Sequence, residues 1–158
     1  MNENFPERKP FDFGEMCRRN IVPAGHYDLS NIIEANNEPL AVFSMDRYLV
    51  TVARYSQFID EGGYFDAECW SESGWEWRVE NNIMAPRFWN EVEWRHLREP
   101  HDRPVVGVSW YEADAFCRFH GGALPTEMQW EAAARGPDGL RYPWGQDWLV
   151  GLVGNRGI

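Results

Sequence analysis

Cysteine, histidine and paired glutamate are the residue types in this chain whose spacing could support chemistry. Cys117 and His120 stand three positions apart, which would bring two metal ligands to one face of a helix. Two ligands are too few for a structural metal site, and Cys117 has apolar neighbours, so a buried structural thiol is the favoured interpretation. The other cysteines, Cys17 and Cys69, are distant in sequence and form no CxxC pair.

Carboxylates and imidazoles offer two further possibilities. Glu127 and Glu131 stand four positions apart and could act as a general acid and base. A structural role is favoured, because negative charge stabilises a helix N-terminus and pairs with basic residues one turn away. No two of the four histidines have His-x-x-x-His spacing, so the sequence does not predict an iron site. These histidines are His26, His96, His101 and His120.

Charge and composition exclude several kinds of partner. The net charge is −10 and the isoelectric point is about 4.8, which disfavours binding to nucleic acid or to an anionic membrane. The first ten residues lack the apolar core of a signal peptide, and we expect no membrane association. An odd number of scattered cysteines argues against a disulfide framework, so the predicted location is the cytoplasm.

Three segments have the signals of short helices that would position these residues. The first should begin at Thr51 and end at Gly62-Gly63, because the apolar residues between them recur at helical spacing. The other two should begin with capping boxes, in which a hydroxyl and a carboxyl or amide satisfy each other's backbone amides. These boxes are Ser109 with Glu112 and Thr126 with Gln129. In the helix that begins at Ser109, the predicted buried face is Ala113, Phe116 and Cys117. In the helix that begins at Thr126, it is Trp130, Ala133 and Ala134.

The remaining segments are predicted to be short strands and long loops. Residues 21–25, 41–50 and 104–108 have strand-like apolar runs, whereas residues 64–103 show no clean period. That irregular stretch is rich in tryptophan, which could stack against a ligand or fill the interior of a loop-rich fold. The interior role is favoured, and the candidates for ligand binding are Trp70, Trp75, Trp77, Trp89 and Trp94.

An ordered series of motifs resembles the sulfatase-modifying-factor family. That family includes formylglycine-generating enzymes and the C-terminal domain of ergothioneine-type sulfoxide synthases. The resemblance covers roughly residues 21–158 and departs from the family pattern at Ala123 and Gln129, where arginine and glutamate are usual. The motifs are Val105–Ala113, Ala115–Cys117, Leu124–Glu127, Trp130–Gly136 and Tyr142–Gly145.

The resemblance implies an α+β, C-type-lectin-like fold with short twisted strands, two or three short helices and long loops. It further implies a polar N-terminal arm over residues 1–20 and a family domain over residues 21–158 that lacks its C-terminal part. In the family, a copper-binding cysteine pair lies in that later part, and the sulfoxide synthases bind iron in a separate helical domain. Asn155 matches a residue that helps to bind structural calcium, so copper and calcium are expected only for a full-length member.

The family activity is oxidation of a substrate cysteine to formylglycine, and we expect this chain not to be catalytic by itself. The alternative hypothesis is a lectin-like module that binds a ligand or a protein through its tryptophan-rich loop, and a protein or peptide is the ligand considered. A domain without its final segments should leave apolar surface open, so we expect self-association or a completing partner segment.

Overall fold

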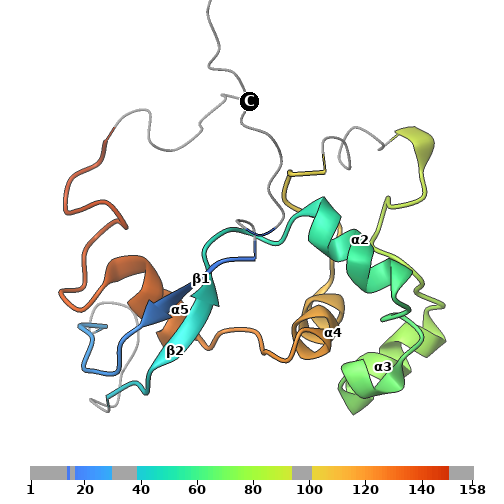
Figure 1. The fold of residues 1–158 in the computed structure, drawn as a ribbon, viewed down its shortest axis with the longest axis horizontal. Coiled ribbons are helices and arrows are strands. Elements are labelled where there is room, and N and C mark those ends of the chain that lie inside the picture. Colours follow the sequence, from blue (N-terminus) through green and yellow to red (C-terminus); the bar gives the residue numbers. More distant parts are fainter. Residues whose placement is uncertain (1–13, 15–16, 30–38, 94–100, 150–158) are drawn as a thin grey trace, which may run out of the picture. The chain divides into compact units, whose positions relative to one another are not determined.

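The computed structural model describes residues 14, 17–29, 39–93 and 101–149, which fall into two compact units (Figure 1). Unit 1 comprises residues 1–18 and 46–124, and unit 2 comprises residues 19–45 and 125–158. The described residues form four α-helices, α2 to α5, the 3₁₀ turn η1, and a two-stranded sheet. The described residues therefore contain at least one helix more than the two or three that the sequence predicted, while the C-type-lectin-like architecture stays a prediction.

Two of the helices in unit 1 begin where their capping residues predicted. Helix α2 spans Val52–Asp60, and the side chain of Thr51 accepts a hydrogen bond from the Arg54 amide. Helix α4 spans Trp110–Phe119 and begins with the complete capping box of Ser109 and Glu112. These starts are predictable because each cap involves residues only three positions apart.

The irregular stretch predicted over residues 64–103 is wrong in its first part. Residues Ala67–Cys69 form η1, and Glu72–Glu80 form helix α3, which is capped by the Ser71 hydroxyl. Helix α3 has no single apolar face, because aromatic and charged side chains are distributed around its whole circumference. Hydrophobic periodicity therefore could not detect it.

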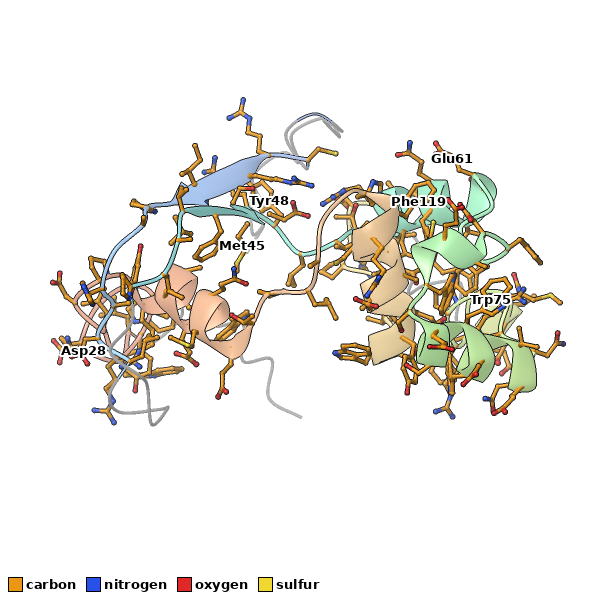
Figure 2. The ribbon with its side chains drawn as sticks, turned by 90° about the horizontal axis from the view of Figure 1, so that it is seen from below. Asp28, Met45, Tyr48, Glu61, Trp75 and Phe119 are labelled. Atoms are coloured by element: carbon orange, nitrogen blue, oxygen red, sulfur yellow. The ribbon has the colours of Figure 1, made fainter. Side chains whose placement is uncertain are left out.

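The core of unit 1 lies around α4, which contacts α2, η1 and α3. The rings of Tyr55 and Phe116 stack with centroids 5.2 Å apart, and Phe58 meets Phe116 edge-on at 5.8 Å. Figure 2 shows the side chains of this unit crowded between the helices, with Phe119 and Trp75 among those packed against the core. The fully formed core cluster comprises Tyr55, Phe58, Tyr64, Cys69, Trp70, Ala115 and Phe116.

Residues 104–108 form no strand, in contrast to the prediction. Pro104 makes an isolated bridge with Thr51, and the Val105 amide donates to the Val50 carbonyl at 2.9 Å. Gly107 then adopts a left-handed conformation with φ of 78°, which interrupts the extended backbone. A Cβ atom at this position would lie only 2.3 Å from the carbonyl oxygen of Arg87, so only glycine fits.

Unit 2 contains the strand pair and the last helix. Strand β1 spans Arg19–Val22, strand β2 spans Phe43–Asp46, and helix α5 spans Glu127–Arg135. Both views show α5 alongside the strand pair (Figures 1 and 2). Helix α5 begins with the predicted capping box of Thr126 and Gln129 and ends at Gly136.

The predicted buried face of α5 is wrong. Trp130 is 56% exposed and Ala133 is also exposed, whereas Ala132 and Arg135 are buried. The pattern misled because it assigned the apolar side chains to the interior, and in this helix an arginine occupies the interior position. No described helix has the length and apolar character required to cross a membrane.

Candidate functional site

A buried chain of hydroxyl and carboxyl groups joins three segments of unit 1. The Tyr64 hydroxyl donates to Glu112 Oε1 at 2.6 Å, and the Ser109 amide donates to Glu112 Oε2 at 2.7 Å. The hydroxyls of Tyr55 and Tyr64 lie 3.1 Å apart. Because the one proton of Tyr64 is committed to a carboxylate, which only accepts, Tyr55 is the donor between the two tyrosines. Glu112 thus serves the capping box and the core at once.

The environment of this chain keeps both phenols protonated. Burial raises the pKa of Tyr64 above its ordinary value, and the neighbouring Tyr55 and Glu112 raise it further. Burial also raises the pKa of Tyr55, with the Glu112 charge adding to the effect. The tyrosines are therefore stable hydrogen-bond donors that hold α2, the turn at Tyr64 and α4 together. Nothing in this arrangement makes them proton acceptors at neutral pH.

The tryptophan candidates occupy different environments. Trp70 is only 5% exposed, and its indole N–H donates to the Gly63 carbonyl at 2.9 Å, so it is a core residue without a free stacking face. Trp75, Trp77 and Trp89 are half-buried, and Trp77 packs on Tyr111 with centroids 5.3 Å apart. Trp94 lies outside the described residues. Trp70 is therefore unavailable for stacking, and a ligand-binding role for the other candidates stays a prediction.

The three cysteines occupy different environments. No disulfide joins them in the part of the chain that the structure describes, and Cys17 is exposed, Cys69 buried and Cys117 half-buried. Burial and the adjacent Asp66 raise the pKa of Cys69 to about 11, so its thiol is protonated at neutral pH. His120, proposed as a second ligand with Cys117, packs its ring on Phe116 at 4.4 Å.

The described residues offer few side chains that are placed to bind a metal ion together. Among residues 17–29, 39–93 and 101–149, no three histidine, cysteine, aspartate or glutamate side chains are grouped as a metal ion would require. The proposed calcium ligand Asn155 lies outside the described residues. Glu131 is engaged with Arg135, with 3.8 Å between Oε2 and Nη1, which is the ion-pairing role that its spacing indicated.

Unit 2 contains a pocket that sequence reasoning missed. Its volume is about 570 Å³, and it lies between helix α5 and the loop that follows. The Arg135 side chain anchors that loop, donating from Nε to the Leu140 carbonyl at 2.6 Å and from Nη2 to the Gly139 carbonyl at 3.0 Å. The lining residues are Trp130, Glu131, Ala134, Arg135, Gly139, Arg141, Pro143 and Gln146. The signal that could have revealed it is a lone arginine at a core position of α5.

The turn after this pocket is built by aromatic stacking. Tyr142 and Trp144 stack with centroids 5.3 Å apart and nearly parallel planes, and the Tyr142 and Gly145 backbones exchange two hydrogen bonds. The Trp144 indole N–H donates to the Asp147 carbonyl at 3.1 Å. This turn carries the Tyr-Pro-Trp-Gly motif, so the motif has a structural reason to be aromatic.

Comparison with known proteins identifies the family. The family model described as the sulfatase-modifying factor enzyme 1-like domain matches residues 9–154. The hercynine oxygenase of Mycolicibacterium smegmatis is 36% identical over an alignment 159 residues long, which covers 87% of this chain and 37% of that protein. The hercynine oxygenase of Mycolicibacterium thermoresistibile is 36% identical over 140 residues, which cover 83% of this chain and 31% of that protein.

A second group of relatives is named for a different activity. The formylglycine-generating enzyme of Streptomyces coelicolor is 34% identical over 132 residues, which cover 71% of this chain and 42% of that protein. The chain thus spans about a third of the length of the hercynine oxygenases that it matches. The chain belongs to the family of sulfatase-modifying factor enzyme 1-like domains.

Proposed function

We propose that this chain is the sulfatase-modifying-factor-type domain of an oxygenase of the hercynine oxygenase kind. The extent of the similarity carries this proposal. Three hercynine oxygenases match 82%, 83% and 87% of the chain, whereas three formylglycine-generating enzymes match 68%, 70% and 71%. The hercynine oxygenases therefore share a longer part of this domain. Formylglycine generation is the second candidate, because those enzymes reach a similar identity of 32–34%.

The described residues suit a supporting role in such an enzyme. The Tyr55–Tyr64–Glu112 chain and the aromatic core make unit 1 a rigid platform, but they are buried and cannot contact a substrate. The buried Cys69 thiol is also unsuited to redox catalysis, because its raised pKa keeps it protonated. We therefore propose that this chain does not carry out the oxidation by itself. The lectin-like module hypothesis gains no support from the relatives named above.

The proposal includes a reducing, cytoplasmic location. Cys17 is exposed, and no disulfide forms among the described residues. Exposed thiols persist most readily in a reducing compartment, which supports that location.

A pair of domain exchanges tests the assignment. In the first chimera, this chain replaces the matching part of the Mycolicibacterium smegmatis hercynine oxygenase. In the second, it replaces the matching part of the Streptomyces coelicolor formylglycine-generating enzyme. Circular dichroism and thermal melting establish that each chimera is folded.

We expect the first chimera to consume oxygen in a hercynine-dependent manner and the second to produce no formylglycine in a cysteine-containing peptide. Oxygen uptake and mass spectrometry of the products measure the two activities. If both chimeras are folded but only the second is active, the domain would be assigned to the formylglycine-generating enzymes instead.

A further inference from the structure

The pocket of unit 2 contains a buried positive charge whose hydrogen-bonding capacity is only partly used. Arg135 is 9% exposed and donates from Nε and Nη2 to two loop carbonyls. Its Nη1 atom is buried and has no hydrogen-bond partner among the described residues. Glu131 Oε2 is 3.8 Å from that atom, which is an ion-pair distance but too long for a hydrogen bond. A buried guanidinium donor in this state favours an incoming acceptor.

The net charge of the pocket lining also favours an incoming hydrogen-bond acceptor. Among the described lining residues, Arg135 and Arg141 are opposed by Glu131 alone, so this lining has a net positive charge in a chain whose overall charge is −10. Gln146 adds a neutral amide, whose oxygen accepts from the Arg141 backbone N–H at 3.3 Å. The amide NH₂ of Gln146 thus remains a donor. Guanidinium and amide donors around one cavity match the acceptor pattern of a carboxylate.

Part of the pocket lining is apolar. Trp130 is 56% exposed although it lies on the helix that forms the pocket wall, and Pro143 and Ala134 complete this part of the lining. An exposed indole beside cationic donors is a frequent arrangement in binding sites, because the ring packs against an apolar group while the charges fix its orientation.

We propose that this pocket binds a carboxylate that is attached to an apolar group. Arg135 Nη1 and the Arg141 guanidinium would receive the carboxylate, and Trp130 would pack against the apolar part. Two sources share this chemistry, a free organic acid and an acidic side chain next to an apolar one in a polypeptide. The inference concerns a site separate from the oxygenase assignment and does not depend on it.

The test uses the full chain and two pairs of probes. The first pair is N-acetyl-leucine and its uncharged amide, and the second is a capped Leu-Asp-Leu peptide and its Leu-Asn-Leu counterpart. Heteronuclear NMR follows the indole N–H signal of Trp130, which the Trp130→Phe variant assigns. We expect saturable shifts with both carboxylate probes and none with their neutral partners. The tighter-binding carboxylate probe identifies the source.

Arg141→Gln is the informative variant, because Arg135 also holds the loop and its replacement could unfold the unit. Loss of one charge-assisted hydrogen bond should weaken carboxylate binding by about tenfold. Arg87→Gln is the matched control, since it removes an equal charge from an exposed position in unit 1. Equal shifts with the charged and neutral probes, unchanged affinity in Arg141→Gln, or no shift of the Trp130 signal would each overturn the proposal.

Discussion

At the scale of single residues, tryptophans of this chain differ in their environments and roles, although the chain has nine residues of this one type. Trp70 is enclosed and hydrogen-bonded, Trp144 is half-buried in a stacked turn, and Trp130 is exposed at the edge of a pocket. Their chemistry is identical, so the differences arise from which neighbours each indole meets. The residue type alone therefore predicts neither stability nor binding for any one of them.

Truncation of Trp70 should be far more costly than truncation of Trp130. We expect Trp70→Ala to lower the free energy of unfolding by about 3–5 kcal/mol, because it leaves a cavity against Tyr64 and an unpaired Gly63 carbonyl. Trp130→Ala should cost less than about 1 kcal/mol, because its side chain is mostly in water. Urea denaturation measures both, and similar losses in the two variants would show that the placement of these indoles is wrong.

The buried tyrosines predict a dependence of stability on alkaline pH. Burial raises the pKa of Tyr64 and Tyr55 in the folded state, so above the ordinary tyrosine pKa of about 10 the unfolded chain loses protons first. Stability from these groups is complete below that pH and declines as the pH rises beyond it.

The decline should be shallower in Tyr64→Phe, which should also be about 1–3 kcal/mol less stable at neutral pH because Glu112 loses a donor. Tyr48→Phe removes a phenol that is 44% exposed and serves as the control, with a decline like that of the wild type. Urea titrations between neutral pH and the alkaline range provide the slopes. If the stability of Tyr64→Phe depends on pH as that of the wild type does, the buried tyrosines are not the cause of the alkaline decline.

At the scale of elements, three helices begin where local sequence signals predict, whereas the formation of one helix depends on tertiary packing. Helices α2, α4 and α5 begin at capping residues that are recognisable in the sequence. Helix α3 also has a serine cap, but its aromatic residues spread around the helix and pack on α4 and on their own neighbours. Its existence therefore owes more to the α4 contact than to any pattern of its own.

The capping boxes should contribute measurably to stability. We expect Ser109→Ala and Thr126→Ala each to cost about 1 kcal/mol, because each leaves a helix-start amide without its acceptor. Ser73→Ala, at an exposed position in the first turn of α3 whose cap is Ser71, should be neutral or slightly stabilising, since alanine is the better helix former. Thermal and chemical unfolding midpoints compare the three. A loss in Ser73→Ala as large as in the cap variants would count against the capping argument.

At the scale of the whole molecule, the described surface includes many large apolar side chains. Ile21, Leu49 and Val92 are 75%, 73% and 74% exposed, and Trp148 and Leu149 are about half exposed. Scattered exposure of this kind is common on folded proteins, but here it accompanies a small core in unit 2, where Leu29 and Ala132 are among the few buried apolar residues. Such surface favours contact with other polypeptide.

We therefore expect the isolated chain to self-associate as its concentration rises. Light scattering coupled to size exclusion should give a mass above the 18.5 kDa of one chain, with the excess growing with concentration. Added salt should not dissociate the oligomers, because salt screens charge interactions and not apolar contacts. A constant monomer mass over the whole concentration range would contradict this expectation.

The sequence by itself determined the family and most helix starts. Caps and turns act over three or four residues, so Thr51, Ser109 with Glu112, and Thr126 with Gln129 carry their structural meaning in the chain itself. The ordered motifs from Val105 to Gly145 likewise identified the sulfatase-modifying-factor relationship, which the comparisons confirm.

The tertiary structure alone decided what these elements enclose. Glu112 is joined to Tyr64 across 48 positions of sequence, Arg135 is enclosed by a loop that it holds in place itself, and Gly107 must be glycine because the Arg87 carbonyl lies against it. Burial, and with it the raised pKa values and the pocket, depends on distant segments meeting. No local pattern encodes such a meeting, because the free energy of a side chain in the interior is set by neighbours that only the folded chain supplies.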